Sequence, residues 1–445
     1  MLRHSIVILV NLLVTFSLSA GCKNSNHCAG NPNDDCRLDA GSGDSCTGNV
    51  DCTSSSTPVC DVTGSMTCVQ CLPDQADACA GTTPVCGDDH ACTECTSHAQ
   101  CTTSEVCLPD GSCAEEGDVA YVGGSGATDN DQCTMTVPCT KVSKALATSR
   151  TFVKFSGTTN EQVTLTNRNV TFLADPGAKL TDMTNGILVR IDGTSEVAIY
   201  DLEVSGASGA SNPGISLQPG NTASLSLRRV TISGNQGGGI TTSGGSLTIS
   251  QSTISSNQGG GIIMATAGAV DITNSFIHHN GNTVGASAGG LSLRPMVGSK
   301  VEFNTIIDNQ ANLGAASAGG VFCDTNGFIA ANNLIFRNTG GPSGNVQTFG
   351  NCMYGNSFNM PGSGASDNTP AFANPNSEPY DYHLTTSSPS SVLDAAGACS
   401  TSDFDGEARP AGGACDLGAD ERTVNFRIDT IMLPSKDIGA DEVTP

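Results

Sequence analysis

The stretch VTISGNQGGGITTSGGSLTISQSTISSNQGGGI, residues 230–262, contains the pattern on which the fold depends. It holds two copies of one motif, in which an isoleucine precedes an asparagine by three residues and a glycine run ending in an aliphatic residue follows. Successive asparagines of this kind are 22, 23, 29 and 29 residues apart. A period in the twenties, with short alternating β-branched stretches, predicts a solenoid of stacked short strands. The offset occurs at Ile232/Asn235, Ile254/Asn257, Ile277/Asn280, Ile306/Asn309 and Ile335/Asn338.

The repeated isoleucines and asparagines are expected to form two columns. Equivalent residues of neighbouring turns lie roughly 4.8 Å apart along the axis of such a solenoid. The isoleucines would then form an internal column, while the asparagines hydrogen-bond to one another along a column of bends. Asparagine suits a bend because it tolerates left-handed backbone angles. An ordinary β-sandwich is the alternative, but it does not explain five coincident offsets, so we predict an all-β parallel solenoid.

The N-terminus carries the features of a secretory leader. An apolar run over residues 6–18, too short to span a bilayer, is followed by SAGC, which ends at Cys22. This ending resembles the lipobox of bacterial lipoproteins, although Ser19 stands where that pattern prefers leucine. The resemblance implies a signal peptide over residues 1–21, acylation of Cys22 and a membrane contact through the lipid alone. It places the protein in the cell envelope of a Gram-negative bacterium, at the outer membrane or the cell surface.

Cysteines dominate the region between the leader and the solenoid. Setting Cys22 aside leaves an even number of the 21 cysteines, which favours disulfides in an oxidising compartment. The segment from Cys28 to Cys113 has hardly any large apolar residue and cannot build a core without crosslinks. We expect residues 22–117 to be a loop-dominated, disulfide-stapled stalk, similar to the Cys-rich repeats of bacterial surface lipoproteins. After Cys28 and Cys36 come three units of four: Cys46, Cys52, Cys60, Cys68; Cys71, Cys79, Cys86, Cys92; and Cys95, Cys101, Cys107, Cys113.

Two points about these cysteines stay open at the level of sequence. The Cys-x-x-Cys junctions at residues 68–71 and 92–95 would indicate tetrahedral zinc in a cytosolic protein. Behind a secretory leader we interpret them as disulfides. The pairing within each unit does not follow from the spacing.

Charge and composition limit the partners. The net charge is −24, with 43 acidic against 19 basic residues, which disfavours nucleic acid and anionic polysaccharide as partners. Aromatic residues make up 4% of the chain and tryptophan is absent, which removes the best stacking surface for sugar rings. A neutral polysaccharide or a surface protein remains as the expected partner, and the oligomeric state is not predicted.

Residues 118–150 carry an extended YVG at 121–123, a PCT at 138–140 and an amphipathic stretch over 141–147. They resemble the N-terminal cap of the pectate-lyase-like right-handed β-helix superfamily, in which a first strand and a short helix cover the open strand edges. The resemblance implies that the solenoid, residues 151–365, is a right-handed parallel β-helix. Two further disulfides are expected here: Cys133 with Cys139 in the cap, and Cys323 with Cys352 across the last turns.

Residues 366–422 carry the most specific set of motifs. In order, these are NTPAF at 368–372, YHL at 382–384, SP at 388–389, DFDG at 403–406, RP at 409–410 and DLGADE at 416–421. The set resembles the C-terminal segment known as choice-of-anchor Q, found after β-helices on secreted bacterial proteins. A tail, residues 423–445, repeats the last motif as DIGADE at 437–442. We expect Cys399 to pair with Cys415 in this segment.

Candidate functional residues are few. In hydrolases of this superfamily paired carboxylates occur as Asn-Thr-Asp and Asp-Asp, followed by Gly-His-Gly and Arg-Ile-Lys, and residues 118–365 contain none of these strings. The residues that precede the repeated asparagines include His279, Asp308 and Arg337, which would stack on consecutive turns as base, acid and cation. A surface charge ladder is the alternative interpretation, with His278 as a solvated bend residue. Asp403, Asp405, Asp416 and Asp420 could hold Ca²⁺ through oxygen ligands, or serve only as bend residues.

The sequence therefore favours a surface-displayed, lipid-anchored β-helix protein that acts without catalysis in adhesion or envelope interaction. It predicts no cofactor other than this Ca²⁺. The alternative is a surface-tethered polysaccharide lyase or glycoside hydrolase whose site follows no recognised pattern.

Overall fold

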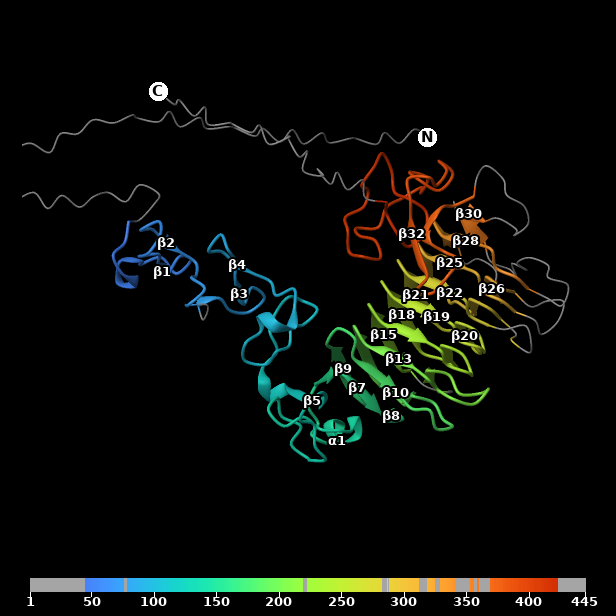
Figure 1. Ribbon diagram of the computed structural model, residues 1–445, viewed down its shortest axis with the longest axis horizontal. Helices are drawn as coiled ribbons and strands as arrows, with labels where there is room; N and C mark the ends of the chain where they lie inside the picture. The colour runs from blue at the N-terminus through green and yellow to red at the C-terminus, as the bar shows by residue number, and fades with distance from the viewer. Residues whose placement is uncertain are drawn as a thin grey trace, which may run out of the picture. The chain divides into compact units, whose positions relative to one another are not determined.

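The computed structural model describes residues 45–75, 78–218, 222–281, 286, 288–311, 318–324, 329–340, 353–355, 358–359 and 369–422 (Figure 1). The chain divides into two compact units, Met1–Val69 and Gln70–Pro445, each of which is treated by itself below. The expected leader, Cys22, Cys28, Cys36, Cys352 and the tail 423–445 lie outside the described residues. No helix of the described ranges is long and apolar enough to cross a membrane.

Disulfides organise the Cys-rich region. In the first unit, a 3-10 turn (η1, Asn49–Asp51) and a hairpin of β1 (Val59–Cys60) and β2 (Cys68–Val69) carry two of them. The second unit opens with two repeats of the same kind, which contain the hairpin of β3 (Val85–Cys86) and β4 (Cys92–Thr93) and the 3-10 turn η3 (His98–Gln100). A further 3-10 turn, η4 (Glu116–Asp118), follows the last cysteine of the repeats. In all three repeats the first cysteine pairs with the third and the second with the fourth. The pairs are Cys46–Cys60, Cys52–Cys68, Cys71–Cys86, Cys79–Cys92, Cys95–Cys107 and Cys101–Cys113.

From residue 119 the chain forms a parallel β-solenoid, in which each turn adds one strand to each of three sheets. Over the described residues these sheets have ten, nine and seven strands, and every pairing within them is parallel. The ten-stranded sheet contains β5 (Val119–Gly123), β6 (Phe152–Ser156), β9 (Asn169–Ala174), β12 (Glu196–Tyr200), β15 (Ser224–Arg228), β18 (Ser246–Ser250), β21 (Ala269–Thr273), β24 (Lys300–Glu302), β27 (Ile329–Ala331) and β29 (Met353–Gly355).

The other two sheets run beside it along the solenoid. The nine-stranded sheet contains β7 (Thr158–Asn160), β10 (Lys179–Thr181), β13 (Glu203–Ser205), β16 (Thr231–Ser233), β19 (Thr253–Ser255), β22 (Phe276–His278), β25 (Thr305–Ile307), β28 (Leu334–Phe336) and β30 (Phe358–Asn359). The seven-stranded sheet contains β8 (Val163–Thr166), β11 (Val189–Asp192), β14 (Ile215–Leu217), β17 (Ile240–Thr242), β20 (Ile262–Met264), β23 (Leu291–Leu293) and β26 (Val321–Cys323).

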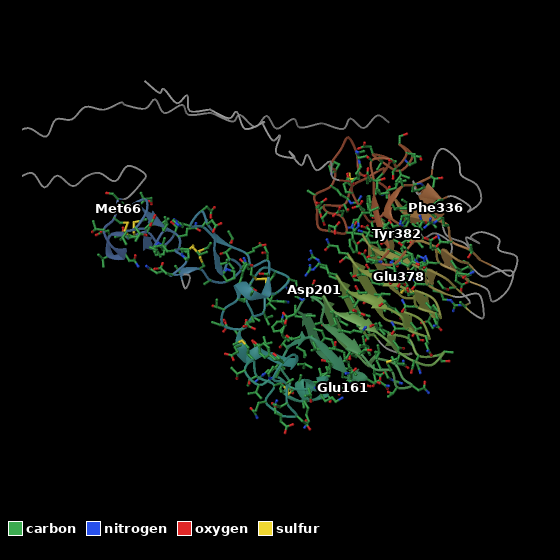
Figure 2. The ribbon with its side chains drawn as sticks, in the orientation of Figure 1. Met66, Glu161, Asp201, Phe336, Glu378 and Tyr382 are labelled. Carbon is green, nitrogen blue, oxygen red and sulfur yellow. A yellow bond between two sulfur atoms is a disulfide. The ribbon has the colours of Figure 1, made fainter. Side chains whose placement is uncertain are left out.

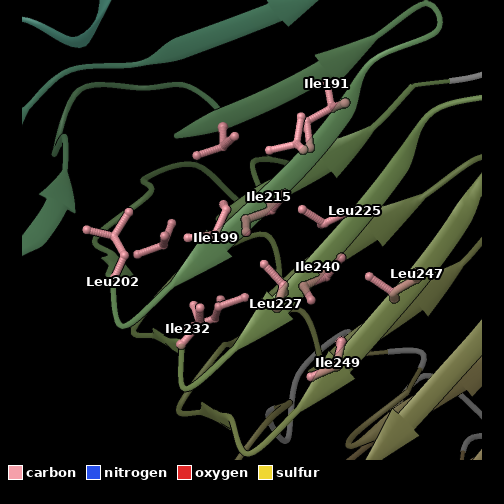
Figure 3. Close-up of a cluster of buried hydrophobic side chains, with 14 of the residues drawn as sticks. Ile191, Ile199, Leu202, Ile215, Leu225, Leu227, Ile232, Ile240, Leu247 and Ile249 are labelled. Atoms are coloured by element: carbon pink, nitrogen blue, oxygen red, sulfur yellow. The ribbon is translucent and has the colours of Figure 1, made fainter. Parts of the chain in front are cut away.

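Aliphatic side chains in matching positions fill the solenoid. Leu225 and Leu227 of β15 pair in register with Leu247 and Ile249 of β18, and Figure 3 shows them one above the other inside the coil. The residues between them point outward, so each strand alternates buried and accessible positions. The predicted isoleucine column is present and completely buried: Ile232, Ile254, Ile277, Ile306 and Ile335 are each 0% exposed.

The predicted asparagine column is also present. Each amide donates from Nδ2 to Oδ1 of the asparagine one turn further along, at 2.9 Å for all four steps from Asn235 to Asn338. A second, unpredicted pair of the same kind joins Asn304 to Asn333 at 3.1 Å. All of these side chains are 0% exposed. Because a buried amide is costly unless it is bonded, the column stabilises the stack only as a complete chain.

Our backbone explanation for this column was wrong. The left-handed residue of each bend is the one before the asparagine, with φ between 52° and 64° at Gly234, Ser256, His279, Asp308 and Arg337. This residue turns the chain, and the asparagine that follows then points inward to the amide column. The asparagines are therefore required for their hydrogen bonds and not for their tolerance of left-handed angles.

The glycine runs lie where neighbouring turns approach closely. A Cβ atom on Gly261 would come within 2.5 Å of the carbonyl oxygen of Gly290, and one on Gly239 within 2.6 Å of that of Gly261. Real Cβ atoms do not tolerate such contacts, so the runs permit the bend of one turn to rest on the next.

One end of the solenoid is covered by the segment from β5 onward. The helix α1 (Val142–Ala147) lies beside β5 (Figure 1), and its buried Val142 and Ala145 belong to the main core cluster. The disulfide Cys133–Cys139 closes the loop before α1. β5 itself is the terminal strand of the ten-stranded sheet, so the expected cap contributes a strand to the solenoid as well as a cover.

The C-terminal segment, residues 369–422, packs against the outside of the solenoid. It contains one hairpin, β31 (Phe372–Asn374) and β32 (Asp381–Leu384), and a loop stapled by Cys399–Cys415. A buried cluster joins it to β22, β25 and β28, and includes Tyr382 and Phe336, both labelled in Figure 2. Backbone contacts add to this junction, since Ala419 N–H donates to Thr305 Oγ1 at 3.0 Å and Asn274 Nδ2 donates to the Ser402 carbonyl at 2.8 Å.

Candidate functional site

The three residues proposed from the bend column lie together. Each of them comes directly after a strand of the nine-stranded sheet: His279 follows β22, Asp308 follows β25 and Arg337 follows β28. Their φ angles are 53°, 55° and 52°. Arg337 binds both carboxylate oxygens of Asp308, with Nε to Oδ1 at 2.8 Å and Nη2 to Oδ2. The guanidinium also donates to the carbonyl of Pro375 at 3.2 Å. The register of the solenoid therefore creates a charged pair next to a histidine.

Two tyrosines of β32 and the loop before it complete this group. The Tyr382 hydroxyl donates to Asp308 Oδ2 at 2.7 Å and lies 3.3 Å from His279 Nδ1. The Tyr380 ring stacks on the His279 imidazole, with centroids 3.9 Å apart and planes 23° from parallel. The sequence did not point to either tyrosine. The only available signal was their alternation at positions 380 and 382 in a chain that has just five tyrosines.

The protonation states follow from burial and the neighbouring groups. Burial lowers the pKa of His279, and it lowers that of His278 to about 3. Both imidazoles are therefore neutral at pH 7. Burial and the bond to Asp308 raise the pKa of Tyr382, so its hydroxyl keeps its proton. Burial opposes the charge of Arg337, but the hydrogen bonds to Asp308 outweigh it and raise the pKa of Arg337.

His278 is not the solvated bend residue of our alternative interpretation. It is the last residue of β22, is 7% exposed, and packs with its ring centroid 5.0 Å from that of Tyr382. Its Nδ1 lies 3.1 Å from Nδ1 of His279. Because its side chain lies under the C-terminal segment, its role is to fill the junction.

A shallow, open pocket of about 430 Å³ lies over this group. Its walls come from the bends after β22, β25 and β28 and from the β31–β32 loop, so it exists only because the C-terminal segment is docked. The lining residues are His279, Asp308, Gln310, Arg337, Thr339, Pro375, Asn376 and Tyr380.

Asp308 occupies two of the reactive groups of the pocket. It holds the guanidinium of Arg337 in its charged form, so the neutral imidazole of His279, which is stacked on Tyr380, is the one uncharged base among the described lining residues. Hydrolysis by paired carboxylates requires a second acid, whereas Asp308 is the one acidic side chain that the described residues contribute to the lining and already accepts from Arg337 and Tyr382. What remains accessible is a set of amide, hydroxyl and guanidinium donors beside an aromatic ring.

The four aspartates proposed for Ca²⁺ do not form one site. Asp403 accepts backbone N–H bonds from Glu407 at 2.8 Å and Glu421 at 3.1 Å. Asp416 accepts from the N–H groups of Asp394 at 2.7 Å and Arg422 at 2.9 Å. These two carboxylates satisfy turns, as in the alternative that treats them as bend residues. Asp405 and Asp420 instead lie near His383, which the sequence did not single out.

The cysteines of this part of the chain are paired as follows. Cys133 pairs with Cys139, and Cys399 pairs with Cys415. Cys323 is disulfide-bonded, while its expected partner Cys352 lies outside the described residues.

A comparison with protein families agrees with the solenoid. Residues 185–371 match the family model described as a right handed beta helix region. Among solved structures, the crystal structure of pectate lyase Pel9A is similar, at 15% sequence identity with a TM-score of 0.37, over 68% of this chain and 96% of that chain. None of the curated proteins compared with the chain matches it. The chain is therefore an all-β protein built on a right-handed parallel β-helix, preceded by a disulfide-rich region with little secondary structure.

Proposed function

We propose that this protein is a lipid-anchored surface protein that binds a neutral glycan, without cleaving it, in the pocket beside Tyr380. The observation that carries the proposal is the pairing of Asp308 with Arg337 and Tyr382. This pairing occupies the Asp308 carboxylate and keeps Arg337 charged, and it fixes the guanidinium in one orientation, while the His279 imidazole is stacked against Tyr380. A rigid, preorganised guanidinium beside an aromatic ring suits the recognition of hydroxyl groups.

The charge of the chain decides the class of glycan. A net charge of −24 repels polyuronates and sulfated polysaccharides at long range. A neutral polysaccharide meets no such barrier. Its hydroxyls find donors and acceptors in Gln310, Thr339 and Asn376, and a sugar ring can pack against the Tyr380 side chain. The long solenoid would then serve to display this pocket away from the membrane.

Retention of the purified full chain on a panel of immobilised neutral and acidic polysaccharides, with and without Ca²⁺, tests the proposal. We expect retention on a neutral glycan without Ca²⁺. Tyr380→Ala should weaken binding about fivefold, because a lost aromatic contact costs roughly 1 kcal/mol. Tyr200→Ala is the matched control, since Tyr200 is also partly buried but lies outside the pocket. It should bind as the wild type does.

Mass spectrometry of the same incubations distinguishes the competing functions. New products would show a polysaccharide lyase or glycoside hydrolase, and His279→Ala, Asp308→Asn and Arg337→Lys would then identify the reacting groups. If the incubations give no new products and the protein is not retained on any polysaccharide, the glycan is ruled out and a surface protein is left as the partner. Equal retention of Tyr380→Ala and wild type would place the glycan elsewhere on the chain.

The lipid anchor is a separate part of the proposal with its own test. Cys22 follows a leader whose end resembles a lipobox, and acyl chains there would hold the protein on a membrane at about 0.8 kcal/mol per buried CH₂. Labelling with a radioactive fatty acid followed by cell fractionation should find the wild type labelled and in the membrane fraction. Cys22→Ser should be unlabelled and released. Ser19→Leu, which supplies the preferred leucine, should remain labelled, and an unlabelled wild type would refute the anchor.

A further inference from the structure

Three metal-ligating side chains of the C-terminal segment converge outside the pocket. They are His383 of β32 and Asp405 and Asp420 of the loop that follows it, and one ligand atom of each lies within 4.8 Å of the others. His383 is next to Tyr382 on the strand, so the two side chains leave it on opposite faces. The Tyr382 side chain is buried against His279 and Asp308, while the His383 side chain belongs to this second group, here called the His383 cluster.

The imidazole of His383 is oriented by a carboxylate on its far side. Its Nδ1 lies 2.5 Å from Asp381 Oδ1, and Asp381 also accepts the backbone N–H of His383 at 3.0 Å. Nε2 is consequently turned toward Asp405, with 2.9 Å between Nε2 and Oδ2. It is shielded from solvent and faces the Asp405 carboxylate as an ion pair. A carboxylate that orients the far nitrogen while the near one faces acidic oxygens is the usual environment of a metal-binding histidine.

Asp420 supplies a second observation. Its side chain is buried, with the residue 5% exposed, and its Oδ2 accepts the N–H of Leu384 at 2.6 Å. The cationic side chain beside it is His383, another residue of the group. A buried carboxylate is unfavourable without a positive partner, and a metal ion held between Asp420 and His383 would supply one in place of the imidazole proton.

We propose that His383, Asp405 and Asp420 bind a divalent transition metal of the Zn²⁺ class. One imidazole nitrogen and two carboxylate oxygens suit Zn²⁺ better than Ca²⁺, which prefers oxygen ligands throughout. Ligands bound to one zinc ion at about 2.0–2.2 Å lie roughly 3–4 Å apart, a small closure from the present arrangement. The ion would fasten β32 to the loop 403–420. Because this loop also contacts Gln251 and Asn274 of the solenoid, the metal would stabilise the docked segment.

Calorimetric titration of the oxidised full chain, first treated with a chelator and then dialysed, tests this site. We expect one Zn²⁺ to bind with higher affinity than Ca²⁺. The melting temperature should rise with Zn²⁺ concentration and fall again with chelator, as linkage requires for a ligand of the folded state. Co²⁺ in place of Zn²⁺ should give a visible absorption band that depends on His383.

The variants separate the cluster from general surface binding. Asp405→Asn should weaken Zn²⁺ at least tenfold without unfolding the protein, because the Asp405 side chain is 47% exposed. Asp324→Asn is the matched control, an aspartate 44% exposed and ion-paired with Arg294, and should bind as the wild type does. Absence of Zn²⁺ binding, preference for Ca²⁺, or equal loss in the two variants would each overturn the proposal. None of these outcomes affects the glycan test, which uses Tyr380 and no metal.

Discussion

Replacing Asn257 by alanine should lower the free energy of unfolding by about 3–5 kcal/mol, since each buried polar group left without a partner costs roughly 1–3 kcal/mol. The amide of Asn257 makes four bonds. It donates from Nδ2 to the Ile232 carbonyl and to Asn280 Oδ1, both at 2.9 Å. It accepts at Oδ1 from Asn235 Nδ2 at 2.9 Å and from the Asn235 N–H at 3.2 Å. Alanine would leave these groups unpaired in a site with no access to water.

Urea denaturation followed by circular dichroism measures this effect. The matched control is Thr248→Ala, on β18 of the same turn, because Thr248 points outward and is exposed. Its change should stay within about 0.5 kcal/mol. Asn257→Asp keeps the shape of the side chain but presents a charged oxygen to two acceptors, and should destabilise at least as much as alanine. A loss below 1 kcal/mol for Asn257→Ala would mean that water or a shift of the turn replaces the column.

The columns could be predicted because they are periodic. A parallel stack places equivalent residues of successive turns in contact. A constant offset of three residues between isoleucine and asparagine therefore predicts two columns, and it also predicts which residues lie beside them. The origin of the bend could not be obtained this way. The general tolerance of asparagine for left-handed angles suggested that Asn280 turns the chain, whereas His279 does so, because the amide must point inward to reach its partners.

The candidate site was predictable only in part, for a related reason. His279, Asp308 and Arg337 follow from the register of the solenoid. Tyr382 contacts His279 across 103 residues of sequence, and no periodicity links the C-terminal segment to a particular turn. The His383 cluster was missed because the prediction considered aspartates close in sequence, while the ligand set combines a strand with a loop. Disulfide connectivity was open for the same reason, since spacing does not determine which sulfurs meet.

Replacing Arg409 by alanine should destabilise the docked C-terminal segment by about 3–5 kcal/mol, the usual cost of removing one partner of a buried ion pair. The Arg409 and Glu421 side chains are 0% and 1% exposed, and Nη1 of Arg409 lies 3.1 Å from Oε2 of Glu421. The guanidinium also donates to the carbonyls of Asp416 at 3.0 Å and Gly418 at 2.8 Å. Burial lowers the pKa of Arg409 and raises that of Glu421, so each charge depends on the other.

Limited proteolysis and urea denaturation should both report this loss. Faster cleavage within residues 369–422 is expected for Arg409→Ala, with the solenoid intact, because its aliphatic core and asparagine column do not involve the pair. Arg190→Ala is the matched control. Its side chain is 46% exposed and bonded to Asp192 at 3.1 Å, and an exposed pair contributes less than about 1 kcal/mol.

A double variant separates the pair from the packing around it. Arg409→Met with Glu421→Met removes both charges and fills a similar volume. In the wild type the guanidinium lies 4.8 Å from the centroid of the Phe303 ring, and a methionine would pack there instead. The double variant should therefore recover much of the stability lost by Arg409→Ala. If the double variant is instead as unstable as the single one, the carbonyl bonds of Arg409 and not its charge hold the segment. If Arg409→Ala leaves proteolysis unchanged, the apolar cluster around Tyr382 and Phe336 suffices for docking, and the glycan pocket would persist without the ion pair.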